Sequence, residues 1–292
     1  MDTKRQTILV IVSIAAILLA AGCVAFGDEE GRQGDTDTVV MAYSSWGTAM
    51  SSTNVMKLVL EEAGYNVETV MVDIGVIFLG LSTGEVDCFV DAWLPSCHSE
   101  YMKAYGDKID IVRYNMEGTR IGMVVPAYVT IDSIEELGEH QERFGGEIIT
   151  IEPGSGTIRM TEAAIEEYNL PYKAVAGSEV AMLAALKRAI GNDEWVVITG
   201  WTPHWKFSRW DLKYLDDPKL MYGEEEYIAT LARMGLAEDM PEVYAILERF
   251  HWDPDDMNSV MYDIEHGMSP EDAAAAWVNA NPDKVNEWLG RA

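Results

Sequence analysis

Positive charge is scarce in this chain of 292 residues. Lys and Arg together number 21 against 49 Asp and Glu, which gives a formal net charge of -28 at pH 7. A protein that grips nucleic acid through its phosphates, or an anionic lipid surface through electrostatics, needs basic side chains. The composition therefore excludes a non-specific nucleic-acid binder, and any attachment to a membrane has to come from a local feature of the chain.

Cysteine is also scarce, with three residues in the whole sequence. A structural zinc site needs close pairs of Cys or His. Cys97 and His98 have no second such pair elsewhere, so we expect no metal site. Cys88 and Cys97 are able to form a disulfide in an oxidising compartment. Cys88 also lies in an apolar stretch that suits a small buried side chain, and the spacing leaves both possibilities open.

The most apolar stretch, residues 8–21, is shorter than the roughly 20 residues that a membrane-spanning helix needs. Lys4 and Arg5 precede it and small residues follow it, a pattern that predicts an export signal over residues 1–22. A transmembrane anchor is the lesser alternative. The small residues that end on Cys23 resemble a bacterial or archaeal lipoprotein cleavage site.

That resemblance implies that Cys23 is lipidated. A diacylglyceryl group supplies two acyl chains, which is enough for stable attachment to a membrane. Residues 23–37 are rich in Gly, Asp and Glu and are expected to form a tether. We therefore expect an exported protein that is held by its lipid anchor at the extracytoplasmic face of the cell membrane.

From residue 38 onward, short apolar runs alternate with longer helical patterns. We expect strands at residues 38–43, 66–72, 86–90, 121–125, 147–151 and 195–199, and helices at residues 51–63, 76–81, 133–137, 158–168 and 179–190. From Glu224 on, the pattern predicts helices throughout, several of which begin near a proline. This alternation indicates an α/β protein whose largely parallel sheets are flanked by helices.

Two α/β units followed by a helical tail fit the length of the chain. Because a tail of helices has to pack on one of the units, we expect the chain to cross between them twice, near residues 112–121 and 207–220. This assigns residues 38–116 and 218–292 to a first lobe and residues 117–217 to a second lobe. Ligands in such sheets bind beyond the carboxyl ends of the strands, so the loops that follow the strands are the candidate site.

Three of the nine tryptophans follow expected strands: Trp46, Trp93 and Trp201. Three indole faces around one point form a cage for a methylated ammonium, which is attracted by the ring quadrupole and has no N–H group to satisfy. Indole faces also stack on sugars, so a sugar receptor is an alternative. The remaining tryptophans are expected to pack in the core: Trp195, Trp205, Trp210, Trp252, Trp277 and Trp288.

The motif Gly-Trp-Thr-Pro-His-Trp at residues 200–205 and the string Asp-Ala-Trp-Leu-Pro at residues 91–95 resemble the glycine betaine-binding proteins of osmoprotectant ABC transporters. This family also includes choline-binding members, and the likeness covers residues 38–292. The resemblance implies a type II periplasmic-binding-protein fold, a two-lobed clamshell that closes on a quaternary amine and presents it to a membrane permease. It implies a binding protein that needs no cofactor and is not an enzyme, with Trp46, Trp93 and Trp201 as the cage.

The other end of the ligand needs a partner of its own. Glycine betaine carries a carboxylate, to which His204 can offer a ring N–H and Gly47 and Thr48 can offer backbone amides at a helix N-terminus. Choline-binding relatives have an acid two residues after the first cage Trp, where this chain has Thr48. This favours glycine betaine, with choline, carnitine and proline betaine as alternatives.

A glycine-rich turn opens the helix expected at residues 158–168. It contains Gly154, Ser155, Gly156 and Thr157 and resembles the second-lobe loop of the family. Such a loop is able to close over the ligand, but an ordinary helix cap has the same composition. Both interpretations stay open at this stage.

One motif suggests a different class of protein. Residues 80–84 read Gly-Leu-Ser-Thr-Gly, the pattern of a nucleophile elbow, which would make Ser82 the nucleophile of an exported hydrolase. That motif requires a turn from a strand into a helix. Here it ends an expected helix, so we interpret it as a chance match.

Overall fold

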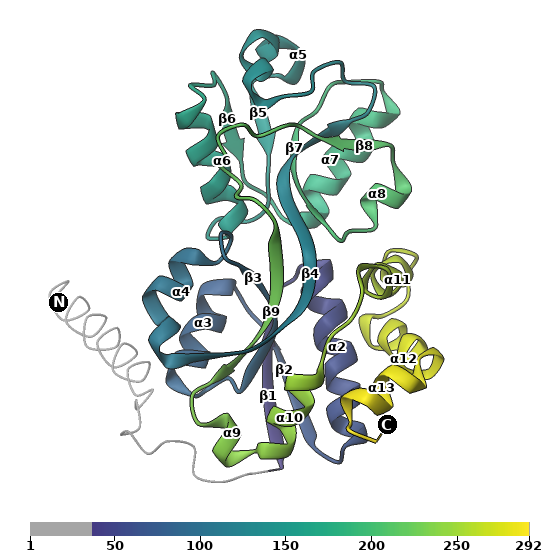
Figure 1. Ribbon diagram of the computed structural model, residues 1–292. Coiled ribbons are helices and arrows are strands. Elements are labelled where there is room, and N and C mark those ends of the chain that lie inside the picture. The colour runs from purple at the N-terminus through teal and green to yellow at the C-terminus, as the bar shows by residue number, and fades with distance from the viewer. Residues whose placement is uncertain (1–36, 292) are drawn as a thin grey trace, which may run out of the picture. The chain divides into compact units, whose positions relative to one another are not determined.

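The computed structural model of the protein describes residues 37–291, which belong to one compact unit. The predictions for the export signal and for lipidation of Cys23 lie outside the described residues. Within them, a nine-stranded sheet has the order β2-β1-β3-β9-β4-β7-β5-β6, and β8 pairs with β4. Helices flank both halves of this sheet (Figure 1). The expected α/β fold class is confirmed.

The first lobe is built on parallel strands near the N-terminus. β1 (Thr38–Tyr43) pairs in parallel with β2 (Asn66–Met71) and with β3 (Cys88–Leu94). Between them lie α2 (Gly47–Glu62) and α3 (Ile74–Thr83), and α4 (Ser99–Tyr105) and the short helix η1 (Gly106–Lys108) follow β3. α3 ends where Gly84 takes the left-handed conformation, φ 80°, which a glycine adopts without strain.

The helix α2 begins four residues earlier than the sequence pattern suggests. Its first turns carry small polar side chains with weak helix propensity. In the structure these side chains are buried, and the hydroxyls of Ser51 and Ser52 donate to the carbonyls of Gly47 and Thr48 at 2.8 Å each. Because these local bonds satisfy the hydroxyls, the polar turns can pack inside the protein.

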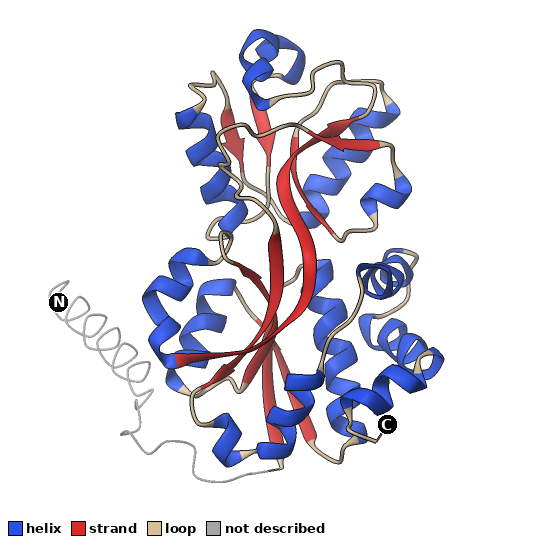
Figure 2. Cartoon of the chain, in the orientation of Figure 1, coloured by secondary structure: helices blue, strands red, loops and turns tan. Residues whose placement is uncertain are grey.

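Two long strands join the two halves of the sheet. β4 (Ile109–Pro126) and β9 (Glu226–Arg233) run antiparallel to each other, and β9 also pairs with β3. Figure 2 shows both strands passing from one lobe into the other. The prediction of helices throughout the tail is wrong at β9, because this strand is buried on both faces and lacks the alternation that marks a half-exposed strand.

The second lobe consists of shorter elements. β7 (Ile198–Thr202) is antiparallel to β4 and parallel to β5 (Glu147–Ile149), which pairs with β6 (Lys173–Val175), while β8 (Leu212–Tyr214) pairs with β4. Its helices are η2 (Ile134–His140), α5 (Gln141–Phe144), α6 (Gly156–Glu167), α7 (Glu179–Gly191) and α8 (Lys206–Arg209). Of the two expected crossings, residues 112–121 lie inside β4, and residues 207–220 include β8.

The C-terminal helices pack on the first lobe. They are α9 (Leu236–Asp239), α10 (Pro241–Arg249), α11 (Pro254–Glu265), α12 (Pro270–Ala280) and α13 (Pro282–Trp288). α11 and α12 lie against α2, as Figure 1 also shows. Trp252, Trp277 and Trp288 are buried here, and Trp277 stacks on Trp288 with ring centroids 5.6 Å apart. These three side chains stabilise the tail by packing, as expected.

Several local predictions need correction. Trp93 lies within β3 and Trp201 within β7, so both are strand residues and not loop residues. Trp195 was expected inside a strand but lies before β7, half-buried, with the guanidinium of Arg143 at 3.4 Å from its ring. Cys88 and Cys97 are both free and buried, which resolves the open disulfide question in favour of unbridged thiols.

Candidate ligand-binding site

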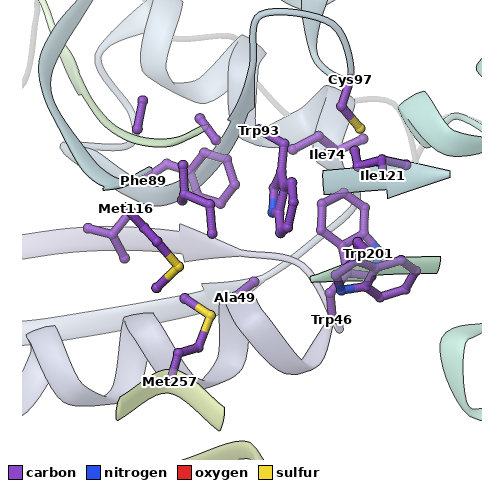
Figure 3. Close-up of a cluster of buried hydrophobic side chains, with 14 of the residues drawn as sticks. Trp46, Ala49, Ile74, Phe89, Trp93, Cys97, Met116, Ile121, Trp201 and Met257 are labelled. Carbon is purple, nitrogen blue, oxygen red and sulfur yellow. The ribbon is translucent and has the colours of Figure 1, made fainter. Parts of the chain in front are cut away.

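Three indole rings meet at a cavity between the lobes. Trp46, Trp93 and Trp201 line it, and their exposed fractions are 5%, 3% and 4%. The cavity is also lined by Thr48, Cys97, Ile121, Ile151, Ser155 and Thr157. Figure 3 shows the three rings close together beside Cys97 and Ile121. None of these lining side chains is charged.

Each indole is held by a regular element. Trp46 is the N-cap residue of α2, directly beyond β1. The backbone N–H of Trp93 donates to Nδ1 of His98 at 3.0 Å, which fixes the carboxyl end of β3. Trp201 pairs with Ile121 across the β4–β7 ladder. The placement of the three indoles therefore follows from strand ends and a helix start, which are rigid supports for side chains.

The second-lobe turn forms the polar side of the cavity. Ser155 is the N-cap of α6, and its hydroxyl accepts from the N–H of Ile158 at 3.4 Å and lies 3.0 Å from the hydroxyl of Thr157. The carbonyl of Gly154 accepts from the Tyr101 hydroxyl at 2.7 Å. The turn is thus both a helix cap and a wall of the cavity, and the two open interpretations of it are compatible.

Gly156 packs directly against the first lobe. A Cβ atom at this position would lie 2.0 Å from the carbonyl oxygen of Cys97 and 2.6 Å from its sulfur. Real Cβ atoms do not approach other atoms this closely, so only glycine fits here. The turn that carries Ser155 and Thr157 therefore reaches its place over the cavity because residue 156 has no side chain.

The buried carboxylate of Asp91 lies next to Thr48. The Thr48 hydroxyl donates to Oδ2 of Asp91 at 2.9 Å, and Asp91 is completely buried. Burial raises the pKa of Asp91 well above its usual value, although hydrogen bonds from Thr48 and Trp93 act against that rise. Within residues 37–291, Oδ1 of Asp91 has no hydrogen-bond partner. Asp91 positions Thr48 but does not itself line the cavity.

Gly47 and His204 lie behind the cavity wall and do not line it. Both donate to one acid, Glu179, the first residue of α7: the Gly47 N–H to Oε2 at 3.1 Å and Nε2 of His204 to Oε1 at 3.0 Å. The N–H of Lys206 donates to Nδ1 of His204 at 3.1 Å, so the proton of a neutral ring is on Nε2. Burial and the charge of Lys206 lower the pKa of His204 to about 4.

Lys206, like Glu179, is a functional candidate that the sequence analysis did not identify. Its side chain is fully buried, and Nζ lies 4.2 Å from the Trp201 ring centroid and donates to the Trp201 carbonyl at 3.3 Å. Burial lowers the pKa of Lys206 to about 7, although the charge of Glu179 acts against that fall. Glu179 begins α7, where an acid is common, and Lys206 begins the four-residue helix α8, so no sequence signal distinguished them.

Several hydrogen bonds connect the lobes around the cavity. Nε1 of Trp46 donates to Glu152, and Nη2 of Arg159 donates to the carbonyls of Ser96 at 3.0 Å and Cys97 at 3.1 Å. Burial raises the pKa of Glu152, while its hydrogen bonds act in the opposite direction. Glu152 was also missed by the sequence analysis. Together these bonds hold the lobes in a closed arrangement.

The structure offers little support for metal binding or for a hydrolase. His98 is buried among the rings of Trp46, Phe78 and Tyr101, and no cluster of potential metal ligands occurs within residues 37–291. Ser82 lies in the last turn of α3, where its hydroxyl donates to the Leu79 carbonyl at 2.8 Å. The Gly-Leu-Ser-Thr-Gly motif therefore ends a helix and lacks the geometry of a nucleophile elbow.

A closed two-lobed α/β fold with a small aromatic cavity between the lobes defines the class of periplasmic binding proteins. The family model of the substrate binding domain of ABC-type glycine betaine transport systems matches residues 37–280. The chain therefore belongs to this family, whose members are substrate-binding receptors and not enzymes. None of the helices within residues 37–291 has the length and apolar character to cross a membrane.

Known proteins agree with this assignment. The chain is similar to the glycine betaine/carnitine transport binding protein GbuC of Listeria monocytogenes, with 41% identity over 160 residues. That match covers 54% of this chain, which spans about half, 52%, of the length of this curated relative.

Two solved structures match over nearly their whole length. Lactococcal OpuAC in its closed form with glycine betaine has a TM-score of 0.83 and 37% identity over 87% of this chain and 99% of that one. The glycine betaine/L-proline-binding protein ProX of Borrelia burgdorferi has a TM-score of 0.84 and 36% identity over 86% of this chain and 96% of that one.

The fold and the family together establish the general role. The described chain is a substrate-binding domain of the family found in ABC-type glycine betaine transport systems. Substrate-binding proteins of ABC importers act outside the cytoplasm.

Proposed function

We propose that this protein captures glycine betaine in a cage formed by Trp46, Trp93 and Trp201 and delivers it to the permease of an ABC transporter. One observation carries the proposal: three indoles from both lobes line a cavity whose lining includes no charged side chain. In such a site a trimethylammonium group is held by ring quadrupoles, each worth roughly 0.5–2 kcal/mol.

Polar groups that suit the carboxylate of the ligand lie at the start of α2 and at the second-lobe turn. Ser155 and Thr157 bring two hydroxyls to the cavity at the start of α6, a helix of 12 residues. The N-terminus of a helix favours negative charge. Thr48 lines the cavity as a further polar contact, whereas the N–H groups of Gly47 and His204 already donate to Glu179. Gly47, Thr48 and His204 stay the proposed partners of the carboxylate, and Ser155 and Thr157 are proposed as further polar contacts from the second lobe.

Calorimetric titration with glycine betaine, proline betaine, carnitine and choline tests the proposal. We expect glycine betaine to bind most tightly, because choline lacks the carboxylate and because proline betaine and carnitine are bulkier than glycine betaine. An analogue with an uncharged tert-butyl head in place of trimethylammonium controls for the shape of the head. Equal affinity for this analogue would contradict recognition by cation–π attraction. A sugar receptor would need many more polar lining groups than this cavity has.

We also propose that residues 38–116 with 218–292 and residues 117–217 move as the two lobes of a clamshell, and that Cys23 carries the lipid anchor. The long strands β4 and β9, which continue from one lobe into the other, support the first proposal. Mass spectrometry of the membrane-bound protein tests the second, since lipidation adds the mass of a diacylglyceryl group at Cys23. Release of a Cys23→Ser variant from the membrane is the expected companion result.

A further inference from the structure

A buried carboxylate lies where the long strand β9 begins. Glu226, the first residue of β9, pairs with Thr119 of β4 and is only 1% exposed. Its Oε1 accepts from the N–H of Ser96 at 2.8 Å, and its Oε2 accepts from the N–H of Cys97 at 3.4 Å. Burial raises the pKa of Glu226, while the hydrogen bonds from Ser96 and Cys97 act in the opposite direction. An acid is costly to bury, so these bonds make the position tolerable.

The turn that receives Glu226, residues 95–98 between β3 and α4, is also held from the second lobe. Nη2 of Arg159 on α6 donates to the carbonyls of Ser96 at 3.0 Å and Cys97 at 3.1 Å, and to the hydroxyl of Ser99 at 3.1 Å. The carbonyl of Ser96 and the N–H of Cys97 belong to one peptide group. This peptide therefore accepts from a guanidinium at one end and donates to a carboxylate at the other. Hydrogen bonds in such a chain polarise and strengthen one another.

The segment that leads into β9 packs closely on the same turn. Gly223 has φ 78°, and a Cβ atom there would lie 2.5 Å from Oγ of Ser96. The hydroxyl of Tyr222 lies 2.8 Å from that of Thr161 on α6. The segment therefore touches both the turn of the first lobe and the helix that carries Arg159.

We propose that Glu226 is a positioning residue for lobe closure, which holds the Ser96–Cys97 peptide so that its carbonyl accepts from Arg159. This inference rests on the proposed clamshell movement of the lobes. In the closed form the peptide connects the buried acid to the guanidinium of the second lobe. In the open form Arg159 is withdrawn, and Glu226 keeps the peptide oriented for the next closure. Glu226 thus stabilises the closed form without lining the cavity.

The alternative is that Glu226 only supports the cavity wall. Cys97 lines the cavity, and a displaced Cys97 would weaken ligand binding whether or not Arg159 is present. The effects of two independent changes add, whereas changes within one chain of hydrogen bonds are coupled. A double-mutant cycle between Glu226 and Arg159 therefore separates the two accounts.

The test combines Glu226→Gln and Arg159→Met, and calorimetry measures the affinity of all four proteins for glycine betaine. The amide keeps the shape of the side chain but loses the charge and one acceptor. We expect Glu226→Gln to lower the affinity by a factor on the order of ten when Arg159 is present. In the Arg159→Met background it should lower the affinity by less than about threefold. The same factor in both backgrounds, or no effect in either, would overturn the proposal.

Glu225→Gln is the matched control, because it removes one negative charge from the exposed neighbouring position. We expect it to leave the affinity unchanged in both backgrounds. If Glu226→Gln does not fold, Glu226→Asp goes through the same cycle, since its carboxylate is one methylene group too short to reach both N–H groups. Equal factors in the two backgrounds would again count against the proposal.

Stopped-flow measurement of tryptophan fluorescence adds a kinetic readout. The bonds from Arg159 to the turn exist only in the closed form. Loss of their support in Glu226→Gln should therefore raise the rate of ligand dissociation about tenfold and leave the association rate nearly unchanged. A change confined to the association rate would contradict a role in closure.

The two proposals fail in different ways. If the unchanged protein does not bind glycine betaine, the proposed function is wrong, and the same cycle read as the radius of gyration without ligand still tests Glu226. If the unchanged protein binds glycine betaine and the two effects are additive, the proposed function stands and the role of Glu226 is wrong.

Discussion

At the scale of single residues, the same amino acid performs two different tasks in this protein. Trp46, Trp93 and Trp201 are buried at the edge of a cavity, whereas Trp277 is buried among other rings of the tail. Their exposed fractions are similar, so burial does not separate the two groups. What separates them is whether one side of the ring meets empty space or other side chains.

Alanine substitutions should therefore have two distinct outcomes. Trp46→Ala, Trp93→Ala and Trp201→Ala should each weaken glycine betaine binding by about 0.5–2 kcal/mol or more, because each removes one cation–π face. Trp277→Ala should instead lower the free energy of unfolding by about 3–5 kcal/mol, because it leaves a cavity in the core. Calorimetry and chemical denaturation measure the two effects. Equal losses of affinity at all four positions, with intact folds, would contradict the assignment of the cage.

A buried histidine makes stability depend on pH. Burial and the charge of Arg159 lower the pKa of His98 to about 3. The unfolded chain binds this proton near pH 6.5 and the folded protein does not, so stability falls as the pH falls below about 6.5. The loss from this one group amounts to about 3 kcal/mol at pH 4.

The variant His98→Asn isolates this contribution. Asn can still accept from the N–H of Trp93 but does not titrate. Between pH 6.5 and pH 4 we expect the unchanged protein to lose more free energy of unfolding than His98→Asn does, as measured by urea denaturation at each pH. Because acids such as Asp91 titrate in both proteins, the difference between the two curves reports on His98. Parallel curves would show that His98 is not the cause.

At the scale of elements, the start of α6 determines whether the lobes can close. Gly156 touches the backbone of Cys97 across the lobe boundary. When residue 156 carries a side chain, either α6 shifts or the two lobes separate. Both changes move Ser155 and Thr157 away from the indoles.

Gly156→Ala should therefore weaken ligand binding at least tenfold while both lobes stay folded, since the added methyl group meets backbone atoms that cannot give way. Gly191→Ala is the matched control. It lies at the end of another helix in the same lobe, and no atom lies within 4 Å of the added Cβ. Calorimetry and circular dichroism distinguish lost binding from lost folding. Full affinity in Gly156→Ala would show that this contact does not limit closure.

At the scale of the whole molecule, ligand binding and lobe closure are one equilibrium. A ligand favours the closed form only by as much as it binds that form better. Arg159 contributes to closure without touching the cavity, since it lies on α6 and donates to backbone carbonyls of the first lobe. Interlobe bonds of this kind set how much of the ligand's binding free energy is used to close the lobes.

Arg159→Met should shift this equilibrium toward the open form. We expect a larger radius of gyration in small-angle X-ray scattering without ligand, and an affinity lower by a similar factor for every ligand. Arg188→Met, at an exposed position on α7, controls for the loss of one positive charge. A variant that changes the preference between ligands but not the radius of gyration would argue against a role in closure.

The sequence by itself determined the class of the protein and indicated which tryptophans we propose as the cage. The motif at residues 200–205 and the positions of Trp46 and Trp93 after strand patterns are local features, and local features can be identified from spacing and composition. For the same reason, the parallel strands of the first lobe were predicted within a few residues. β9 was not, because a strand buried on both faces has no alternation to distinguish it from a helix.

Only the tertiary structure decided which charged groups surround the cage. Glu179, His204 and Lys206 are brought against Gly47 and Trp201 by the packing of α7 and α8 against the strand ends and the start of α2. A pattern in the sequence cannot specify such contacts, because the bond from Gly47 to Glu179 joins residues 132 positions apart and depends on how the lobes close. The same long-range packing removes water from these groups, and that removal gives Lys206 and His204 their altered pKa values.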